Sequence, residues 1–384
     1  MSNERRGRGL EPGAMLGVFG GGQLGRMFGL AARRMGFRFA VFAPEVDGPA
    51  SQIADWCRHA PYDDLAAVQD FAQRVDAVSF EFENVPAVTA VAAAEHVPVR
   101  PNGDLLHMAQ NRIREKRGLQ RAGLPVAPFA EIEPAMDRAT IVSLARELDG
   151  AMILKTASSG YDGKGQIGID DPAGAEAAFE QLGRVPCVLE KKIAFRSEIS
   201  VVGARAVDGS VALYPPIWNE HRNHILDVSV CPAPLPEPVI EQARAHCRTV
   251  LEELDVVGVL CVEFFALADG SLLVNEIAPR PHNSGHLTIE AAHCDQFEQQ
   301  VRAVAGWPLG SAELRSPAAM ANLLGDLWNS GEPDFERAVR EPGVHLHLYG
   351  KESARVGRKM GHLTVLDPRG EQAAERVRAA RDLL

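Results

Sequence analysis

Apolar residues in the first hundred positions fall alternately into short continuous runs and into helical spacing. The runs at 15–19, 37–42 and 76–82 predict strands. The segments 23–35 and 63–74 predict helices, and Pro86 fits the first turn of another helix that extends to about residue 95. This alternation of strand and helix predicts an α/β fold with a doubly wound parallel sheet.

The remainder of the chain predicts further regions. A long charged helix is expected over 104–121, and a strand, a glycine-rich loop, a helix and a second strand within 152–190. Several strands and two helices are expected in 198–305, then a short strand at 344–349 and a final helix. We therefore divide the chain into a flexible leader (1–14), an N-terminal domain (15–112), a central domain (113–195) and a C-terminal domain with a terminal subdomain (196–384).

Composition narrows the class of protein. The 384 residues include 40 Lys and Arg and 51 Asp and Glu, and the net charge of −11 argues against non-specific nucleic-acid binding. The best apolar run carries Glu263 and is too short to span a bilayer. The N-terminal arginines are not followed by an apolar core, so we do not expect a signal peptide. Six cysteines without a Cys-x-x-Cys pair fit a reducing compartment. We expect a cytoplasmic protein that binds neither nucleic acid nor membrane.

Residues 20–25 form a first glycine-rich turn that matches G-x-G-x-x-G between a strand and a helix. Such a turn brings backbone amides and a helix N-terminus close to a phosphate. Glu45 follows about 20 residues later, where an acid could bind the ribose of NAD. The motif alone leaves three possibilities open: NAD, another phosphate-bearing ligand, or a turn that only joins a strand to a helix.

A second glycine-rich segment, residues 160–166, follows the expected strand that carries Lys155. Its glycines can expose backbone donors to phosphate oxygens, and Lys155 and Lys164 could reach the same phosphates. The spacing differs from that of a Walker loop. The alternative is a polar hairpin tip with solvated charges.

Two acidic residues stand in apolar strands that a turn at 268–271 joins into a hairpin. Glu263 lies in the first strand, and Asn275 and Glu276 close the second. Buried acids need a partner or a metal, and oxygen ligands of this kind suit Mg²⁺ beside substrate phosphates. The alternative is a buried ion pair, for example with Arg280.

In chain order, the glycine-rich turn, Lys155, the mobile glycine loop and the paired acids resemble the ATP-grasp superfamily. Residues 275–286, which read NEIAPRPHNSGH, are similar to the signature of the N5-carboxyaminoimidazole ribonucleotide synthetase family. The segments 21–26, 81–86, 160–166, 349–351 and 357–362 resemble further motifs of that family. The resemblance covers about residue 15 to the end. It implies an ATP-grasp fold with a doubly wound pre-ATP-grasp domain, a central lid and a C-terminal mixed-sheet domain.

The resemblance also implies a reaction. Members carboxylate 5-aminoimidazole ribonucleotide with ATP, Mg²⁺ and bicarbonate in purine biosynthesis, through carboxyphosphate, and release ADP and phosphate. Because this intermediate must be kept from water, residues 160–166 fit a closing lid. A homodimer is a further family expectation.

The site residues implied by the resemblance form four sets. The ATP set comprises Arg112, Lys155, Gly160, Tyr161, Asp162, Gly163, Lys164, Gly165, Gln166, Glu190, Lys191, Lys192, Ile193, Glu198, His221, Asn275 and Glu276. The ribonucleotide set comprises Gly22, Gln23, Leu24, Glu81, Asn84, Tyr161, Asp162, Lys351 and Arg358. The bicarbonate region comprises Arg280, His282, Asn283, Ser284 and His286, and the reaction centre is assigned to Tyr161, Asp162, Arg280, His282 and Asn283. The Mg²⁺ ligands are Glu263 and Glu276.

Two positions depart from the family pattern. Asn111 stands where an acid is expected before Arg112, and residues 219–226 fit only in outline, which weakens the assignment of His221. Sibling ATP-grasp enzymes, a formate-using glycinamide ribonucleotide transformylase or a biotin carboxylase-like enzyme, are the main alternatives. The interpretation as an NAD oxidoreductase is supported only by the first glycine turn. A non-catalytic nucleotide sensor is disfavoured, because every position where the family has a reactive residue carries one here.

Overall fold

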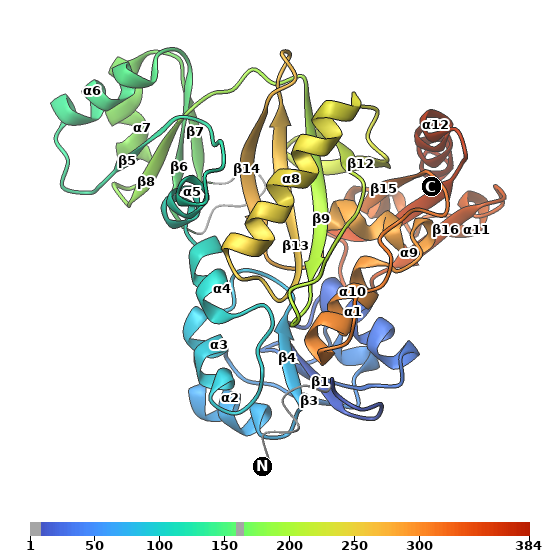
Figure 1. Ribbon diagram of the computed structural model, residues 1–384. Coiled ribbons are helices and arrows are strands. Elements are labelled where there is room, and N and C mark those ends of the chain that lie inside the picture. The colour runs from blue at the N-terminus through green and yellow to red at the C-terminus, as the bar shows by residue number, and fades with distance from the viewer. Residues whose placement is uncertain (1–8, 159–164) are drawn as a thin grey trace.

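The computed structural model describes residues 9–158 and 165–384. Its N-terminal part consists of β1 (Met15–Phe19), α1 (Gln23–Arg34), β2 (Arg38–Phe42), the 3₁₀ turn η2 (Ser51–Ile53), β3 (Trp56–Arg58), α2 (Leu65–Ala72), β4 (Ala77–Phe80) and α3 (Ala87–Ala94). The strands form a parallel sheet in the order β3-β2-β1-β4. Helix α1 covers one face, and α2 and α3 cover the other (Figure 1). The predicted doubly wound parallel sheet is confirmed.

The prediction of one continuous helix over 104–121 is wrong. Helix α4 (Gly103–Ala109) and helix α5 (Arg112–Arg121) are separate. Between them, Asn111 has an extended backbone, and its side chain accepts hydrogen bonds from the backbone N–H groups of Ile113 and Arg114. Asn111 therefore caps α5 and satisfies two amides that a helix start leaves unpaired. Asn111 is not the acid that the family pattern leads one to expect, but its side chain can still cap a helix.

A small antiparallel sheet follows, in the order β5-β8-β6-β7. Its elements are β5 (Phe129–Ile132), α6 (Arg138–Leu148), β6 (Met152–Thr156), β7 (Gln166–Ile169), η3 (Pro172–Gly174), α7 (Ala175–Gln181) and β8 (Cys187–Lys191). Helices α6 and α7 pack on it around their own apolar cluster. Strand β7 was not predicted, because its short Gln-Ile-Gly-Ile run contains a glycine and only two apolar residues. Strands β6 and β7 flank the second glycine-rich segment.

The large sheet has the order β14-β13-β9-β11-β12-β15-β17-β16, and β10 pairs with β9. The elements of this region are β9 (Ser197–Arg205), β10 (Val211–Leu213), β11 (Ile217–Arg222), β12 (Ile225–Cys231), α8 (Glu237–Glu253), β13 (Gly258–Ala266), β14 (Leu272–Ala278), η4 (Asn283–Leu287), α9 (Thr288–Ala291), α10 (Gln296–Ala305), β15 (Ala318–Leu324), η5 (Gly325–Ser330), α11 (Phe335–Ala338), β16 (Val344–Leu348), β17 (Lys359–Leu366) and α12 (Gly370–Arg381). The named strands all pair antiparallel, so the expected mixed sheet is corrected. The predicted hairpin of β13 and β14 is confirmed.

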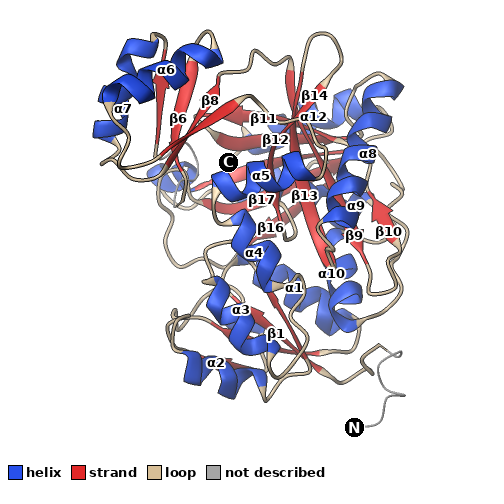
Figure 2. Ribbon diagram, turned by 60° about the vertical axis from the view of Figure 1, so that its left-hand side comes forward, coloured by secondary structure: helices blue, strands red, loops and turns tan. Residues whose placement is uncertain are grey.

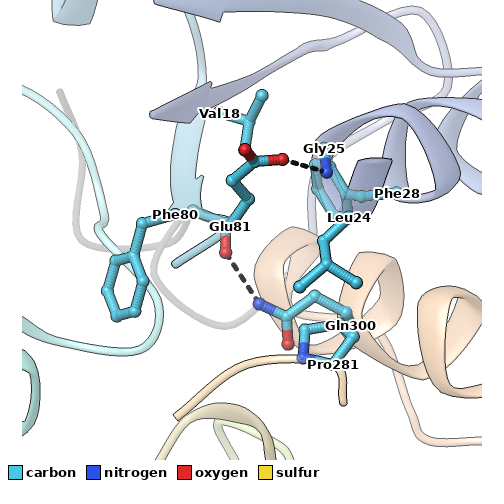
Figure 3. A pocket seen from close by; sticks show the side chains of 9 residues that line it. Val18, Leu24, Gly25, Phe28, Phe80, Glu81, Pro281 and Gln300 are labelled. Carbon is cyan, nitrogen blue, oxygen red and sulfur yellow. Dashed lines mark hydrogen bonds between the residues drawn. The ribbon is translucent and has the colours of Figure 1, made fainter. Parts of the chain in front are cut away.

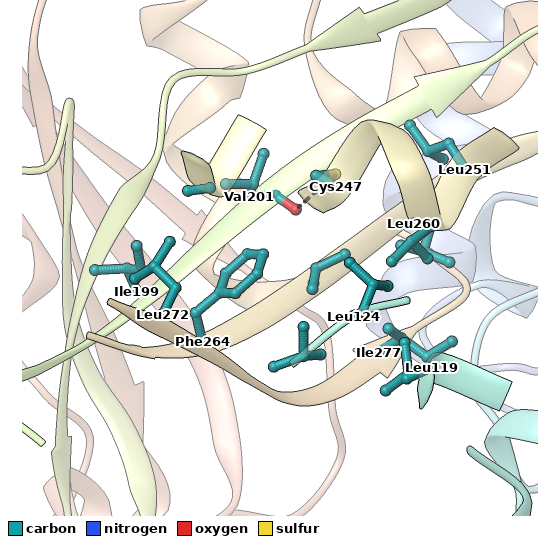
Figure 4. Packing of buried hydrophobic residues seen from close by; sticks show 14 of the residues in the cluster. Leu119, Leu124, Ile199, Val201, Cys247, Leu251, Leu260, Phe264, Leu272 and Ile277 are labelled. Atoms are coloured by element: carbon teal, nitrogen blue, oxygen red, sulfur yellow. Dashed lines mark hydrogen bonds between the residues drawn. The ribbon is translucent and has the colours of Figure 1, made fainter. Parts of the chain in front are cut away.

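Three helices bury the large sheet and join it to the rest of the molecule. Helix α8 packs on β9 and β13 over the cluster shown in Figure 4. Helix α10 contacts α1 and β4 on one side and β9 and β13 on the other, so it fills the junction with the N-terminal sheet. Helix α12 covers β12, β15 and β17. Helix α5 lies between the small and the large sheet in both views (Figures 1 and 2).

The expected flexible leader lies partly outside the described residues. Its described part is tied down: the backbone N–H of Leu10 donates to Ala305, and the indole of Trp307 donates to the carbonyl of Leu10 at 2.7 Å. Among the described helices, none is long and apolar enough to cross a bilayer.

Candidate active site

Polar side chains from the two antiparallel sheets converge where the sheets face each other. Lys155 on β6 and Glu190 on β8 come from the small sheet, and Glu263 on β13 and Glu276 on β14 come from the large one. The charges of Arg112 and Lys155 both act on Glu276, so these groups are close together. The structure therefore assembles the core of the predicted ATP and metal sets in one region.

Two lysines hold the buried carboxylate of Glu190. The ammonium of Lys155 donates to one oxygen at 3.1 Å, and that of Lys116 lies 3.4 Å from the other. Burial alone would raise the pKa of Glu190, but these two cations lower it. Sequence reasoning missed Lys116, because a lysine in a charged helix is usually solvated. The available signal was its position four residues after Arg112, on the same face of α5.

A β-bulge places the two strand acids on the same face of the sheet. Glu263 pairs with Glu276, but the next pair is Phe264 with Val274, so Asn275 is the extra residue. Because side chains alternate along a regular strand, Val274 and Glu276 would otherwise share a face. The bulge lets Val274 stay in the core while Glu276 lies open to solvent beside Glu263.

The paired acids differ in their tendency to bind a proton. Burial would raise the pKa of Glu263, but His282, and then His221 and Arg280, lower it to about 2. Partial loss of hydration of the Glu276 carboxylate within the site, and then the charge of Glu263, raise the pKa of Glu276. The described residues contain no group of three or more His, Cys, Asp or Glu side chains arranged to hold a metal. Two carboxylates with open positions instead fit Mg²⁺ that is shared with phosphate oxygens.

A third acid behind this pair was not predicted. Glu115 on α5 is buried and accepts a hydrogen bond from the backbone N–H of Ile277 at 2.6 Å. Burial, and then the charge of Glu276, raise its pKa to about 8. Glu115 thus anchors α5 to β14 directly beneath the acid pair.

The loop after β14 carries two side chains, Arg280 and His282, that each pair with a carboxylate. A guanidinium nitrogen of Arg280 lies 2.6 Å from Glu83, and Nε2 of His282 lies 2.9 Å from Glu263. The Nε atom of Arg280 is buried and has no partner among the described residues. The Gln296 side chain bonds both the N–H and the C=O of His282 at 2.8 Å, which fixes the loop. Arg280 therefore pairs with Glu83 and not with the strand acids.

Asn283, in the next position, exchanges two hydrogen bonds with Asn322 of β15, at 3.0 and 2.7 Å. Glu198 and His221, on neighbouring strands β9 and β11, are joined at 2.7 Å. Burial would lower the pKa of His221, but the hydrogen bond that it donates to Glu198 and the negative charges of Glu198 and Glu263 together outweigh burial and raise the pKa. Both pairs orient predicted ligand contacts before any ligand binds.

Glu81 binds the first glycine turn from within the protein. Its carboxylate accepts the N–H of Gly22 and that of Gly25, both at 2.7 Å (Figure 3 shows the bond to Gly25). A Cβ atom on Gly20 would lie 2.1 Å from the Glu81 side chain, so this glycine is required for the close approach. The neighbouring pocket in Figure 3 has only about 10 Å³ of free space, about that of one water molecule. The amides that NAD would need are already bonded to Glu81.

Glu81→Gln is expected to destabilise the protein by about 1–3 kcal/mol, because the amide NH₂ would face one of the two backbone donors. Urea denaturation measures the change. Glu45→Gln, at a nearby exposed carboxylate, is the matched control and should leave the free energy of unfolding unchanged. Equal midpoints for Glu81→Gln and the wild type would contradict this role.

Lys351 approaches the glycine turn from the terminal subdomain. Its ammonium donates to the carbonyl of Lys359, and burial, and then Arg358, lower its pKa to about 8. The charges of Lys351 and Glu81 act on each other, which places Lys351 beside the turn. Arg358 donates to Ser353 at 2.7 Å, from the opposite end of the same loop. The other predicted ribonucleotide contacts, Gln23 and Leu24 in the first turn of α1 and Asn84 on the surface, lie at this end of the N-terminal sheet.

Part of the predicted lid lies outside the described residues, namely Gly160, Tyr161, Asp162, Gly163 and Lys164. The described remainder begins at Gly165, whose φ of +66° needs a glycine, and continues with Gln166 opposite Lys155. Of the predicted adenine-binding segment, Lys191 ends β8, and Lys192 and Ile193 follow it.

Three histidines, His286, His347 and His362, form a cluster behind the loop. His286 and His362 are fully buried, and their ring centres are 5.0 Å apart. His347 stacks on His362 at 4.5 Å and pairs with Glu290, and Tyr349 bonds His362 at 2.9 Å. Burial, and then neighbouring positive charges, lower the pKa of His286 and His362 well below the ordinary value. Both rings are therefore neutral in the folded protein.

Acidification should destabilise the fold through these rings. The unfolded chain takes up protons below its ordinary histidine pKa and the buried rings do not, so stability is lost as the pH falls. Each ring costs about 2 kcal/mol at about pH 5. The difference in the free energy of unfolding between the wild type and His362→Gln should therefore become smaller by about this amount when the pH is lowered from about 8 to about 5. Urea denaturation at each pH measures this difference. The raised pKa values of Glu81 and Glu115 oppose this trend but cancel in the difference. His59→Gln, at an exposed site, is the control, and its difference in the free energy of unfolding from the wild type should not change with pH. The same constant difference for His362→Gln would contradict the expectation.

Three family models match consecutive parts of the chain. They are a ribonucleotide synthetase pre-ATP-grasp domain over residues 14–110, an ATP-grasp domain over 117–297 and a phosphoribosylaminoimidazole carboxylase C-terminal domain over 318–376. The N5-carboxyaminoimidazole ribonucleotide synthases of Brucella melitensis and Bacillus subtilis are 42% and 40% identical. The first alignment covers 94% of this chain and 98% of the relative, and the second covers 92% of each.

Solved structures agree over the same length. The N5-carboxyaminoimidazole synthetase of Staphylococcus aureus complexed with ADP is similar with a TM-score of 0.89 at 34% identity. The synthase of Aspergillus clavatus in complex with ADP and 5-aminoimidazole ribonucleotide is similar with a TM-score of 0.88 at 30% identity. Each comparison covers 97% of this chain and 98% of the other.

Proposed function

The chain belongs to the family of N5-carboxyaminoimidazole ribonucleotide synthases, and from this premise we propose how its residues carboxylate 5-aminoimidazole ribonucleotide with bicarbonate and MgATP. The enzyme is an ATP-dependent ligase of purine biosynthesis. The observation that carries the residue assignment is the meeting of the Arg280–His282 loop with the Glu263–Glu276 pair.

The chemistry explains why ATP is needed. Bicarbonate is a poor electrophile because hydroxide is a poor leaving group. Transfer of the γ-phosphoryl group of ATP to a bicarbonate oxygen releases ADP and gives carboxyphosphate. The amine of the ribonucleotide then attacks the carboxyl carbon, or carbon dioxide formed from it, and phosphate leaves.

The nucleotide end of the site is assigned to the small sheet and the strand acids. Lys155, already held by Glu190, neutralises phosphate charge, and Glu198 binds the ribose hydroxyls. Glu263 and Glu276 would hold Mg²⁺, which would neutralise charge on the transferring phosphoryl group. The open, solvent-facing position of Glu276 supports this assignment, since a metal shared with ATP must be reached from outside.

The acceptor end is assigned to the loop after β14 and to the terminal subdomain. Arg280 and His282 contact bicarbonate, since a cation and a hydrogen-bond donor suit an anion with developing charge. Lys351 and Arg358 bind the 5′-phosphate of the ribonucleotide, and Gln23 and Asn84 contact the rest of it. The proximity of Lys351 to the glycine turn supports this arrangement.

Release of ADP from MgATP and bicarbonate, with and without 5-aminoimidazole ribonucleotide, tests the proposal. We expect ADP release to require the ribonucleotide. Formate with glycinamide ribonucleotide, and biotin, serve as parallel substrates. Activity on one of these substrates alone would be consistent with an ATP-grasp enzyme but would overturn the substrate assignment.

We also propose that the enzyme is a cytoplasmic homodimer. All six cysteines are unpaired, which supports a reducing compartment. Sedimentation over a range of concentrations tests the dimer, and a single species of monomer mass would overturn it.

A further inference from the structure

A buried amide on β15, that of Asn322, is bonded on two sides. Its nitrogen donates to the side-chain oxygen of Asn283 at 2.7 Å, and the Asn283 nitrogen donates back to the Asn322 oxygen at 3.0 Å. The same Asn322 nitrogen donates to the backbone carbonyl of Leu226, on neighbouring β12, at 2.8 Å. Asn322 is buried and belongs to none of the predicted ATP, metal, bicarbonate or ribonucleotide sets. It therefore links a predicted reaction-centre residue to the frame of the large sheet.

The orientation of both amides follows from the Leu226 carbonyl. A carbonyl oxygen only accepts, so the NH₂ group of Asn322, and not its oxygen, must face Leu226. The second hydrogen of that NH₂ group is then donated to Asn283, and the Asn322 oxygen accepts the hydrogen that Asn283 offers. Turning either amide round would bring two oxygens, or two NH₂ groups, face to face. Because side-chain amides do not titrate near neutral pH, no change of charge offers a second arrangement.

The pairing leaves part of the Asn283 side chain for a ligand. An amide offers two hydrogens and two lone pairs, and Asn322 takes one of each. Within the described residues, the second hydrogen and the second lone pair have no side-chain partner, and Asn283 is only half-buried. Asn283 directly follows His282, whose ring lies 2.9 Å from Glu263. An N–H group held rigidly in this loop suits an oxygen atom on which negative charge develops.

We propose that Asn322 is a positioning residue, which fixes the Asn283 amide so that its remaining N–H group is presented to the anion derived from bicarbonate. The use of that anion rests on the function proposed above, whereas the orientation of the two amides does not. A donor that is already oriented loses no freedom when the reaction occurs, and this is the condition for strong stabilisation of charge. Strand β15 thus serves the reaction centre without touching the substrate.

Bicarbonate kinetics of the full enzyme test this role. In Asn322→Leu, which removes all three hydrogen bonds, kcat/KM for bicarbonate should fall about 10²-fold, while KM for ATP stays within about twofold. Urea denaturation gives the folded fraction, to which the rates are referred. Asn322→Ala, which leaves room for water at the Leu226 carbonyl, takes its place if Asn322→Leu does not fold. Thr364→Val, which removes a buried hydroxyl without a partner among the described residues from adjacent β17, is the matched control and should keep the wild-type kinetics.

A double-mutant cycle separates positioning from a general loss of structure. Asn283→Ala removes the amide through which Asn322 is expected to act. In that background, Asn322→Leu should change kcat/KM for bicarbonate by less than about twofold, because no amide is left to position. A further loss of about 10²-fold would mean that Asn322 acts by another route, and it would overturn the proposal. Wild-type bicarbonate kinetics in the single variant Asn322→Leu would overturn it as well.

The failure of the proposed function would look different. The wild type would then release ADP with formate and glycinamide ribonucleotide, and not with bicarbonate and 5-aminoimidazole ribonucleotide. The same cycle would be measured with formate in place of bicarbonate. An effect of Asn322→Leu that disappears in the Asn283→Ala background would support the positioning role for that substrate, and independent effects of the two substitutions would overturn it.

Discussion

Glu276→Gln is expected to lower the rate of ADP release by about 10³-fold at saturating ATP. The amide keeps the shape of the side chain but removes the charge that would hold Mg²⁺ on the transferring phosphoryl group. Glu263→Gln should act similarly, because the two acids face each other across β13 and β14. Glu220→Gln, on β11 of the same sheet and outside the proposed site, is the control and should retain activity.

The pH dependence of this effect follows from the acid pair. Because burial, and then the charge of Glu263, raise the pKa of Glu276, bound Mg²⁺ must displace a proton there at lower pH. The Mg²⁺ concentration that gives half-maximal activity should therefore rise as the pH falls. A constant Mg²⁺ requirement across the pH range, together with full activity of Glu276→Gln, would remove this residue from the metal site.

Arg280→Ala is expected to abolish the stimulation of ADP release by bicarbonate, with a loss of about 10³-fold in kcat/KM for bicarbonate. The side chain is mostly buried, its pair with Glu83 aims it, and its Nε atom has no partner among the described residues. Arg280→Lys should recover only part of the activity, because an ammonium cannot reproduce a planar fork of donors.

The control for Arg280 is Glu83→Gln, which keeps the guanidinium and removes only its partner. It should raise KM for bicarbonate much less than Arg280→Ala does. If Arg280→Ala left the dependence on bicarbonate untouched, the assignment of this residue would be wrong, whatever the effect on total activity.

Local patterns were sufficient where neighbours in sequence are neighbours in space. The hairpin of β13 and β14 and the parallel N-terminal sheet follow from runs and turns and are confirmed. The bulge at Asn275 was not predictable, because the sequence does not say which residue of a strand is left without a partner. Strands β15 and β17 were also missed, since they are stabilised by partners far along the chain.

The site shows the same limit. Lys116 and Glu115 lie in a charged segment that looks solvated, and only the packing of α5 between two sheets buries them. The glycine turn was expected to present its amides to a phosphate, but Glu81, which follows β4 more than fifty residues later, accepts two of them. The functional assignment therefore rested on long motifs held in common with a family, which carry three-dimensional information that periodicity lacks.

The unbroken large sheet limits how modular this chain can be. The boundary between the family models falls between residues 297 and 318, yet β15 is bonded to β12 along four residue pairs across it. Removing the last segment would leave β12 as a bare edge with Val228 and Val230 uncovered, a template for pairing between molecules. Fusion or exchange of domains at that boundary would cut through one folded layer. The terminal segment can be inherited or transplanted only together with the strands it completes.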